Sequence, residues 1–359
     1  MTTSIPATID VLCVGLGPAG ARAAATAARA GLAVVAVDRR RRAGLPVQCA
    51  EFVPALIGST VRALAESVRQ SIRAMETRIE ACTPDLTDPF PGQMLDRAAF
   101  DAALVAEAVA MGADCRFGVS ARAVGPDGCV ALSDGTHVHA SVLIGADGPR
   151  SAVGRAIGSV NRRLVETRQI TVPLRLPHDA TDIFLSRDIP GGYGWLFPKR
   201  DVANVGAGVD PEHRGMLKEI VDALHAKLAD SGRVGREVLA ITGGAIPVGG
   251  MVKPTATLGA TQVLLAGDAA GLANPVTGAG IAAAVHSGTL AGEFAVEALR
   301  GDAGTLAAYE DELDALFGAA LARARRRRDE LAQELRSAVA PAPAALRRGW
   351  VAYPEYWAA

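Results

Sequence analysis

The sequence predicts an α/β fold that combines a parallel sheet with covering helices, an inserted antiparallel β-sheet and a C-terminal helical segment. Three observations predict it. An apolar strand, a Gly-rich turn, an Ala-rich helix and a second apolar strand follow one another near the N-terminus. Segments with alternating apolar residues fill the middle of the chain, and a long amphipathic pattern comes after them. Strands that alternate with helices favour parallel pairing, whereas consecutive strands favour an antiparallel sheet.

The N-terminal elements form a βαβ unit. Residues 10–14 and 33–37 are apolar runs typical of buried strands, and residues 19–30 form an Ala-rich helical pattern between them. The connecting turn reads Gly15-Leu-Gly-Pro-Ala-Gly20. This order of strand, glycine-rich turn and helix is the context that a dinucleotide-binding turn requires.

Each glycine of this turn has a physical role. Gly15 permits the tight turn, Gly17 lets backbone amides approach a pyrophosphate, and Gly20 lets the helix pack against the strand. The positive end of the helix dipole faces the anion. Asp38, at the end of the second strand, can bind ribose hydroxyls, which favours FAD or NAD over a cofactor with a 2′-phosphate. The unit therefore predicts a Rossmann-like FAD/NAD(P)-binding domain.

A later turn, within residues 264–281, indicates a flavin. An apolar strand ends at Gly267, and Asp268 can then accept hydrogen bonds from a sugar-like hydroxyl. Gly278 and Gly280 open the apolar helix that follows. This arrangement suits a ribityl chain beside an isoalloxazine. His286, on the same helix, is expected to be a buried structural histidine rather than a catalyst.

The middle of the chain predicts a sheet that can form a substrate pocket. Its strands show alternating apolar residues, and they cover residues 165–176, 181–186, 193–197 and 203–209. Tyr193, Trp195 and Phe197 have period-2 spacing and therefore share one face. Two interpretations stay open, because aromatic residues in strands either pack in the sheet core or line a pocket for an apolar substrate.

The C-terminal part predicts a long amphipathic helix over residues 302–339, which carries the basic run 323–328. Such a run either faces solvent or contacts anionic lipid headgroups, and both interpretations stay open. A break at Pro341-Ala-Pro343 precedes an aromatic tail, which docks on the body of the protein or on a second subunit. The oligomeric state is not predicted.

These segments suggest a division into domains. Residues 1–160 and 255–300 are assigned to a discontinuous FAD-binding domain, and residues 161–254 to a substrate-binding β-sheet domain. Residues 301–359 are assigned to the C-terminal helical segment and tail.

Composition restricts the function classes. The 359 residues are 50% hydrophobic and 21% charged, as in ordinary globular proteins. A formal net charge of −1 gives no overall attraction to nucleic acid. The five cysteines lack metal-ligand spacing, so neither a metal site nor a disulfide framework is expected. With no targeting or membrane-spanning pattern, the expected location is the cytoplasm, with peripheral membrane contact as an open alternative.

The order of motifs resembles a known superfamily. A Gly-x-Gly-x-x-Gly turn, an Arg-x-x-Phe-Asp helix over 96–111, a strand ending at Ala146-Asp147-Gly148 and a late Gly-Asp-Ala turn follow one another. This order resembles the FAD-dependent oxidoreductases of the para-hydroxybenzoate hydroxylase superfamily. Within it, residues 47–51, 191–199 and 275–281 are similar to the geranylgeranyl reductase family.

The resemblance implies roles on the adenine side of FAD. It places the first turn, through Ala19, against the FAD pyrophosphate, and Asp38 against the adenosine ribose. Arg97 is implied to lie near the pyrophosphate. Ala121 is implied to contact the adenine through its backbone.

The resemblance also implies roles on the flavin side. Asp268 is implied to hold the ribityl and pyrophosphate groups, while Gly280 and Ile281 present amides to the pyrimidine edge of the flavin. Asp147 is implied to support the riboflavin side. The chain departs from many such reductases at Ala279, where they carry glutamate.

Cys49 is the candidate catalytic residue. The resemblance brings a cysteine of this loop toward the flavin, where its thiol can donate a proton to one carbon while hydride reaches the neighbouring carbon. The alternative is an inert thiol, which is the usual fate of a free cysteine.

The sequence therefore predicts a FAD-dependent reductase of carbon–carbon double bonds in an isoprenoid or similar small apolar substrate. NAD(P)H or ferredoxin is the expected reductant. A flavin monooxygenase of a small aromatic or amine metabolite, and a non-catalytic flavin- or lipid-binding protein, are the alternatives, because one fold hosts several chemistries.

Overall fold

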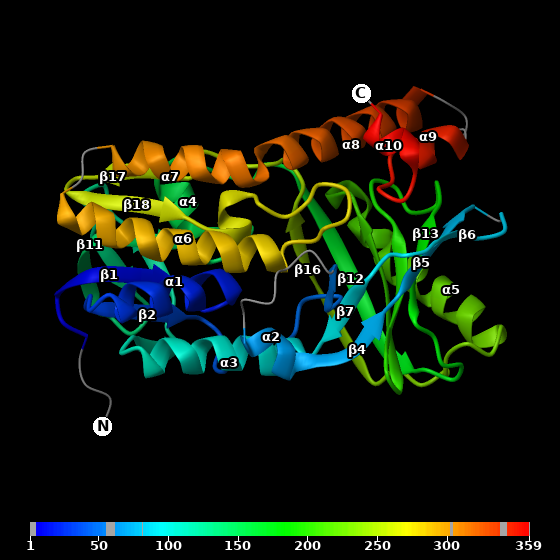
Figure 1. Cartoon of the computed structure of the whole chain (residues 1–359), viewed down its shortest axis with the longest axis horizontal. Helices are drawn as coiled ribbons and strands as arrows, with labels where there is room; N and C mark the ends of the chain where they lie inside the picture. The colour runs from blue at the N-terminus through cyan, green and yellow to red at the C-terminus, as the bar shows by residue number, and fades with distance from the viewer. Residues whose placement is uncertain (1–4, 55–61, 81, 302–303, 338–342, 359) are drawn as a thin grey trace.

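The computed structural model describes residues 5–54, 62–80, 82–301, 304–337 and 343–358. These residues form two lobes, a Rossmann-like lobe on the left of Figure 1 and a sheet lobe on the right. The C-terminal helices lie along the top of both lobes in this view.

A mainly parallel sheet forms the centre of the Rossmann-like lobe. Its strands follow the order β17 (Thr255–Leu258), β18 (Thr261–Leu265), β11 (His137–Gly145), β1 (Thr8–Val14), β2 (Val34–Asp38) and β8 (Asp114–Phe117). Only β17 pairs antiparallel among these strands. The chain runs from β1 to β2 on one side and to β11 on the other, so the carboxyl ends of β1 and β11 flank a switch point where ligands bind in such folds.

Three helices pack side by side in this lobe, namely α3 (Arg97–Ala110), α1 (Pro18–Arg29) and α6 (Ile281–Arg300). The backbones of α1 and α6 lie very close. A Cβ atom added at Gly288 would lie 2.1 Å from the Ala19 carbonyl oxygen, and one added at Gly292 would lie 2.6 Å from the Thr26 Cβ. Only glycine therefore fits at these two positions, which explains glycines inside an apolar helix.

The sheet lobe confirms the four predicted strands. Its sheet has the order β16 (Ala240–Pro247), β12 (Leu164–Pro173), β15 (Val202–Val209), β14 (Gly194–Lys199), β13 (Ala180–Leu185), β5 (Ala74–Ile79) and β6 (Asp85–Thr87). All neighbours are antiparallel except β13 and β5. Both β5 and β6 come from the range 1–160, which the sequence analysis assigned to the FAD-binding domain, so this sheet is built from two separate stretches of chain.

Smaller elements complete the two lobes. A three-stranded sheet joins β3 (Phe52–Pro54), β7 (Gly92–Leu95) and β4 (Val68–Ile72), and the short strands β9 (Ala121–Val124) and β10 (Val130–Leu132) extend from β11. The remaining helices and helical turns here are α2 (Arg62–Ser67), α4 (Ala152–Ala156), α5 (Leu217–Asp230), η1 (Pro211–Met216) and η2 (Gly267–Ala270).

The predicted C-terminal helix consists of α7 (Thr305–Leu313), a π-helical turn (Asp314–Gly318) and α8 (Ala319–Ser337). Residues 302–303 and 338–342, which include the predicted break at Pro341, lie outside the described residues. The tail forms α9 (Pro343–Arg348) and α10 (Pro354–Trp357). It packs on the body, because Leu346, Trp350 and Tyr353 are buried against the sheet lobe.

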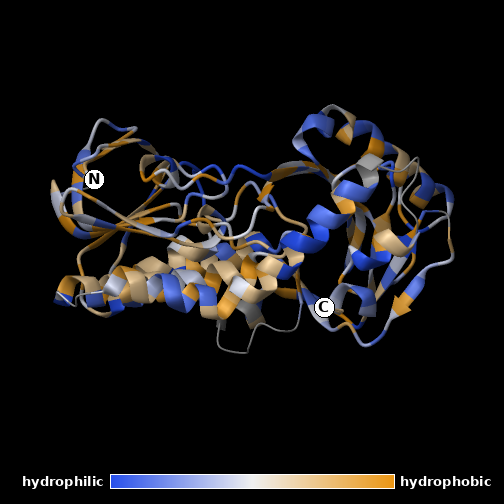
Figure 2. Ribbon diagram, turned by 90° about the horizontal axis from the view of Figure 1, so that it is seen from above, coloured by the Kyte–Doolittle hydropathy of each residue, from blue (hydrophilic) through white to orange (hydrophobic). Residues whose placement is uncertain are grey.

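Helix α8 is strongly hydrophilic where it crosses between the lobes (Figure 2). Part of its basic run nevertheless contacts other segments of the chain. Arg327 is 5% exposed and donates to the carbonyl oxygens of Tyr356 and Ala358. Arg323 stacks over the Trp357 ring at 5.2 Å. Within the run, Arg325 and Arg326 are exposed. No helix among the described residues has the length and apolar character needed to cross a membrane.

Candidate active site

The first turn is closely packed at two of its glycines and open at the third. Gly15 has φ +100°, and a Cβ there would lie 2.3 Å from the Ala146 oxygen. A Cβ at Gly20 would lie 1.7 Å from the Gly15 oxygen. A Cβ at Gly17 would meet no atom within 4 Å. The turn therefore requires glycine at Gly15 and Gly20 for packing and leaves free space at Gly17.

Asp38 holds this turn in place. Its two carboxylate oxygens accept hydrogen bonds from the backbone amides of Leu16 at 2.8 Å and Arg40 at 2.7 Å, and the residue is 6% exposed. The Asp38 carbonyl accepts from the Val119 amide at 3.0 Å. This contact brings the chain just before β9, where Ala121 begins the strand, beside the end of β2. The ribose and adenine contacts of Asp38 and Ala121 stay predictions.

Two helix N-termini meet beside Gly267. Helix α1 begins after Gly17 and α6 after Gly280, and neither has a side-chain cap. A Cβ at Gly267 would lie 3.1 Å from the Ala19 Cβ and 3.4 Å from the Ala284 Cβ. Uncapped helix starts carry backbone N–H groups without helical partners and attract anions. The convergence of α1 and α6 thus offers amide donors on two sides of one space.

Asp268 adds an acceptor at the same place. No hydrogen bond to its carboxylate is found among the described residues, and burial raises the pKa of Asp268 to about 6 although the charge of Arg97 opposes this rise. An ionised carboxylate only accepts hydrogen bonds, so this group matches a ligand rich in hydroxyl donors. The open turn, the uncapped helices and the unpartnered Asp268 carboxylate together fit FAD.

Asp147 is engaged within its own turn. Its carboxylate accepts from the Ser151 hydroxyl at 2.5 Å and from the Ala152 amide at 2.6 Å, which fixes the turn between β11 and α4. Burial raises the pKa of Asp147, and these two hydrogen bonds oppose the rise. Asp147 thereby shapes the wall against which Gly15 packs.

Hydrogen bonds also hold the last turn before α6. The Asn274 side-chain oxygen accepts from the amides of Val276 at 2.9 Å and Thr277 at 3.0 Å. The Tyr193 hydroxyl donates to the Thr277 carbonyl at 2.6 Å, which joins this turn to the sheet lobe. Gly278 has φ +69° and Ala279 is exposed, so Ala279 leaves the surface of the turn without a carboxylate.

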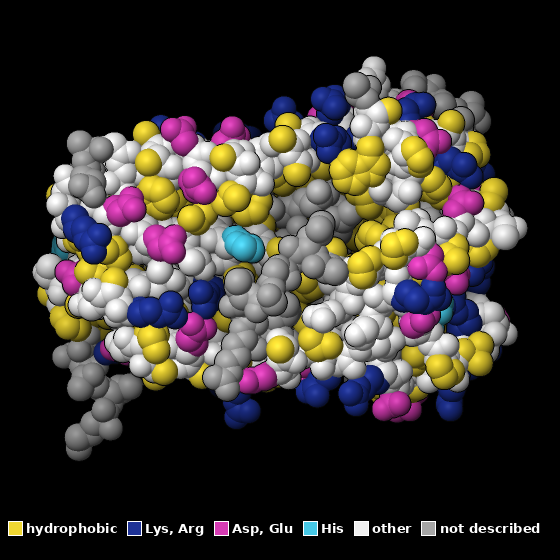
Figure 3. All heavy atoms as spheres, in the orientation of Figure 1, with side chains coloured by type: hydrophobic (Ala, Val, Ile, Leu, Met, Phe, Trp, Pro, Cys, Tyr) yellow, Lys and Arg dark blue, Asp and Glu magenta, His cyan; other side chains and the backbone are white. Residues whose placement is uncertain are grey.

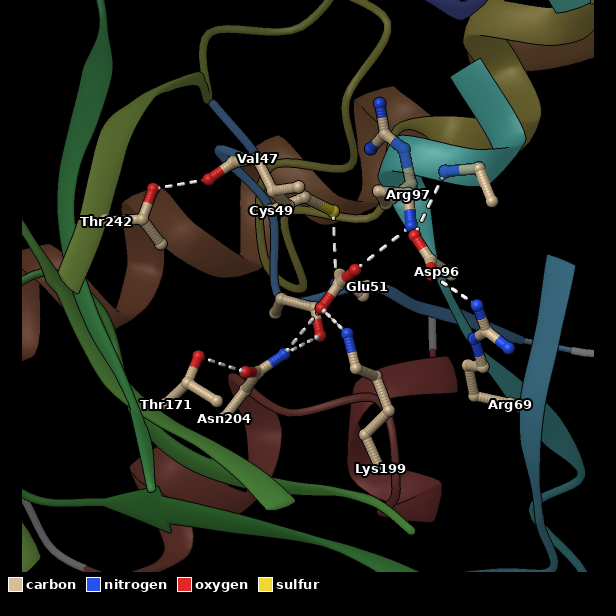
Figure 4. A network of polar contacts seen from close by, with 12 residues as sticks. Val47, Cys49, Glu51, Arg69, Asp96, Arg97, Thr171, Lys199, Asn204 and Thr242 are labelled. Carbon is tan, nitrogen blue, oxygen red and sulfur yellow. Dashed lines mark hydrogen bonds and ion pairs between the residues drawn. The ribbon is translucent and has the colours of Figure 1, made fainter. Parts of the chain in front are cut away.

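The Cys49 loop, residues 47–51, runs between the two lobes (Figure 4). Each of its first four residues forms a hydrogen bond with the sheet lobe, three as backbone acceptors and Gln48 as a side-chain donor. Thr242 donates to the Val47 oxygen at 2.5 Å, Gln48 donates to the Gly243 oxygen at 3.0 Å, Gln169 donates to the Cys49 oxygen at 3.2 Å and Asn204 donates to the Ala50 oxygen at 3.3 Å. The loop is therefore fastened along its length.

The Cys49 thiol contacts the backbone of its own loop and lies near the start of α3. The Glu51 backbone amide donates to the Cys49 Sγ at 3.2 Å. Arg97 is held by Asp101 through two hydrogen bonds of 2.9 and 3.0 Å. Burial opposes the charge of Arg97, yet Asp101 and Cys49 raise its pKa. Arg97, implied by the resemblance to lie near the pyrophosphate, is thus electrostatically coupled to both Cys49 and Asp268.

The three aromatic residues of β14 and its start form one wall. Trp195 and Phe197 are each 6% exposed, and Tyr193 stacks edge-on against Trp195 at 5.7 Å between ring centroids. The Trp195 indole donates to the Gln169 side-chain oxygen at 3.0 Å. Burial raises the pKa of Tyr193, and the nearby Cys49 adds to the rise. The predicted aromatic face therefore adjoins the Cys49 loop.

The tail covers this wall. Trp350 is 3% exposed, and its ring centroid lies 4.8 Å from that of Tyr193. Its indole N–H has no hydrogen-bond partner among the described residues. Figure 3 shows the surface hollowed between the lobes, with hydrophobic side chains on the rim formed by the sheet lobe.

Sequence reasoning missed several members of this site. Lys199 continues the period-2 row of Tyr193, Trp195 and Phe197, which was a usable signal. Glu51 follows the candidate cysteine by two residues, but its partners come from the distant elements α3, β14 and β15. Gln169, Asn204 and Trp350 carried no signal in the sequence. The expectation of a buried His286 is wrong, because His286 is exposed on α6, where the helix has turned its polar side outward.

One acidic cluster lies away from this site. Glu76, His178 and Asp182 approach one another closely enough to share an ion. Asp182, however, is completely buried and accepts two hydrogen bonds from Arg233 at 2.7 and 3.1 Å. The guanidinium already balances its charge, which makes the cluster an ion pair of the sheet lobe.

Comparisons with known proteins agree with this geometry. The family model of the geranylgeranyl reductase catalytic domain matches residues 165–246. Digeranylgeranylglycerophospholipid reductase 2 of Methanopyrus kandleri is 36% identical over 337 residues, which cover 86% of this chain and 83% of the relative. The digeranylgeranylglycerophospholipid reductase of Methanosphaerula palustris is 32% identical and covers 84% of this chain and 81% of the relative.

Solved structures show the same fold. A geranylgeranyl bacteriochlorophyll reductase-like protein of Thermoplasma acidophilum has a TM-score of 0.81 and 26% identity, with 97% of each chain covered. PqsL of Pseudomonas aeruginosa, a probable FAD-dependent monooxygenase, has a TM-score of 0.71 at 19% identity, with 92% of this chain and 97% of the other covered, and shares the fold alone. The identity and coverage of the two reductase relatives, together with the FAD-fitting turns, show that this chain belongs to the geranylgeranyl reductase family of FAD-dependent oxidoreductases.

Proposed function

We propose that this protein reduces carbon–carbon double bonds in the isoprenoid chains of a lipid, with Cys49 as the proton donor. One observation carries the proposal. The Cys49 loop is joined to the start of α3 through Glu51, whose carboxylate accepts from the Arg97 amide, and to the aromatic wall through Gln169, which binds both the Cys49 carbonyl and the Trp195 indole. A cofactor on one side and an apolar chain on the other would both reach it.

The chemistry divides between cofactor and protein. When bound, a reduced flavin supplies a hydride to one carbon of the alkene. The Cys49 Sγ gives its proton to the neighbouring carbon, so that the π bond is replaced by two C–H bonds. The resulting thiolate is stabilised by the Arg97 guanidinium and the Glu51 amide, and it regains a proton from water. The aromatic wall orients the chain and excludes water.

We assign the remaining predicted roles within the same proposal. The backbone of the first turn and the start of α6 bind FAD, and they include Gly15, Gly17, Ala19, Gly20, Gly278, Gly280 and Ile281. Asp38, Ala121, Arg97, Asp147 and Asp268 bind or shape the cofactor site. Tyr193, Trp195 and Phe197 line the substrate pocket. A digeranylgeranyl lipid is the proposed substrate because the curated relatives carry that name, and NAD(P)H or ferredoxin is the proposed reductant.

We also propose a peripheral contact with membranes, since a lipid substrate has to be taken from a bilayer. Arg325 and Arg326 are its only candidates in the basic run, because Arg323, Arg327 and Arg328 have partners within the described chain. A contact of two residues is weak, at about 1 kcal/mol per basic residue.

The test compares wild type with Cys49→Ser and Cys49→Ala in a chemically reduced, FAD-loaded state. A geranylgeranyl lipid is supplied in detergent, and mass spectrometry follows the gain of two hydrogen atoms per double bond. We expect Cys49→Ala to lose about 10²- to 10⁴-fold in kcat, as for removal of a general acid, and FAD affinity to be unchanged. Full activity of both variants would remove Cys49 from the mechanism. Oxygen uptake with an oxygenated product would instead favour a monooxygenase.

A further inference from the structure

Glu51 is a buried acid whose backbone and carboxylate both form hydrogen bonds outside its own turn. It is 4% exposed and has φ +69°, a left-handed conformation that costs energy for a residue other than glycine. Its amide donates to the Cys49 Sγ, and its carbonyl accepts from the Leu95 amide at 2.8 Å. The strained backbone thus aims one N–H at the thiol.

The Glu51 carboxylate is satisfied by both lobes (Figure 4). One oxygen accepts from the Arg97 backbone amide at 3.0 Å, at the start of α3. The other accepts from the Lys199 ammonium at 2.6 Å and the Asn204 amide at 3.0 Å, at the end of β14 and in β15. Asn204 is itself oriented by Thr171, whose hydroxyl donates to it at 3.0 Å. One side chain therefore connects the cofactor-binding lobe with the strand that carries the aromatic wall.

We propose that Glu51 and Lys199 form an ion pair that positions Cys49 between the flavin-binding lobe and the aromatic wall and that balances the charge beside its thiol. Both are positioning residues, because neither needs to touch substrate or cofactor. The inference rests on the proposed role of Cys49 for its effect on catalysis, but not for its effect on the thiol itself.

The charged and titratable groups around Cys49 define what the pair does. Arg97, backed by Asp101, lies on the α3 side and is coupled to Asp268. Tyr193, at the start of β14, is coupled electrostatically to Cys49, although its hydroxyl donates to the Thr277 carbonyl. The Glu51 carboxylate belongs to the residue whose amide binds the thiol, and the Lys199 ammonium balances its charge at 2.6 Å. Removing one partner alone leaves an uncompensated charge of known sign beside the Cys49 loop.

The two single variants consequently shift the thiol in opposite directions. Lys199→Met leaves the Glu51 carboxylate uncompensated, so the pH midpoint of Cys49 alkylation by iodoacetamide rises by about one unit. Glu51→Gln leaves the Lys199 ammonium uncompensated, so the midpoint falls by about one unit. The double variant restores neutrality and returns the midpoint toward the wild-type value. Peptide mass spectrometry of FAD-loaded protein measures Cys49 separately from the exposed Cys82.

A merely structural role of the pair would not shift the pH midpoint of Cys49 alkylation in opposite directions in the two single variants. If the pair only stiffens the loop, both single variants shift the midpoint in the same direction, and the proposal is overturned. It is overturned as well if neither midpoint moves. The control is Lys218→Met, which breaks a surface pair with Asp222 at 2.7 Å whose side chains are 70% and 51% exposed, and leaves the midpoint unchanged. If Lys199→Met fails to fold, Glu51→Gln and the double variant still decide the sign.

Kinetics give the second readout. Lys199→Met lowers kcat by about 10- to 100-fold, because the Cys49 thiol is no longer aligned with the alkene carbon that it protonates. KM for the lipid stays within about twofold of the wild-type value. Lys199→Arg restores part of kcat. If Cys49→Ala proves fully active, the proposed function loses its proton donor, whereas the alkylation midpoints still test the pair. An unchanged midpoint with an inactive Cys49→Ala would remove the pair and retain Cys49.

Discussion

The turns that fit FAD and the loop that carries Cys49 are held by different kinds of contact. The turns rely on backbone, with glycines that allow close approach and helix starts that present amides. The Cys49 loop relies on side chains from distant strands, such as Thr242, Gln169 and Asn204. Backbone sites of this kind are specified by local sequence, whereas a loop fastened by remote side chains depends on the whole fold.

The largest expected effect tests the backbone side of the comparison. Gly20→Ala places a Cβ 1.7 Å from the Gly15 oxygen, so the first turn has to move. We expect a loss of more than about 3 kcal/mol in the free energy of unfolding and no retention of FAD. Thermal denaturation and FAD titration measure both.

Gly17→Ala is the matched control for that change. Its Cβ meets no atom within 4 Å, and its φ of −74° suits alanine. The apo protein keeps its stability, while FAD affinity falls because the methyl group enters the space left for the pyrophosphate. Wild-type affinity in this variant would mean that the pyrophosphate lies elsewhere.

The next prediction tests the side-chain region. Trp350→Ala removes a buried indole that covers Tyr193, and we expect a loss of about 3–5 kcal/mol in unfolding free energy together with weaker binding of long isoprenoid chains. Trp357→Ala, in the same tail but 57% exposed, has little effect on either. If Trp350→Ala lowers the unfolding free energy and the chain affinity no more than Trp357→Ala does, the aromatic wall does not depend on Trp350.

Asp268 gives an effect that depends on pH. Its folded pKa, about 6, lies above the ordinary value of 3.8, so the folded apo protein binds more protons than the unfolded chain between these values. Stability therefore falls as pH rises from about 4 to about 6 and stays lower above that range. Asp268→Asn removes this fall and makes the apo protein about 1–3 kcal/mol more stable at pH 8, while it weakens FAD binding.

Urea denaturation at a series of pH values measures the effect of Asp268→Asn. The exposed Asp188→Asn serves as its control and keeps the wild-type slope. A wild-type slope in the Asp268 variant would mean that Asp268 is not the titrating group.

The smallest effect concerns the surface. Arg325→Ala with Arg326→Ala lowers binding to anionic phosphatidylserine vesicles by about 2 kcal/mol, which is close to 30-fold. Cosedimentation measures this, and the exposed adjacent pair Arg41→Ala with Arg42→Ala is the control. Equal binding by both double variants and wild type would exclude this face of α8.

The sequence was most informative where structure is local. The first turn, the α3 helix capped by Asp96 and the four strands β12 to β15 of the sheet lobe are each encoded by neighbouring residues, and these were predicted. The addition of β5 and β6 to the second sheet was not predicted, because pairing between distant strands leaves no periodic signal in either strand. The basic run of α8 was expected to face solvent or lipid for the same reason, because the partners of Arg323, Arg327 and Arg328 lie in other segments.

The close contact of α1 and α6 has a consequence for how the molecule opens. Because Gly288 and Gly292 bring the two backbones together, neither helix can separate from the other without exposing both. Their amide protons should then exchange with deuterium as one cooperative unit, at a common free energy, although a long stretch of sequence lies between them. The uncapped N-termini of α1 and α6 would therefore form or come apart in the same opening event.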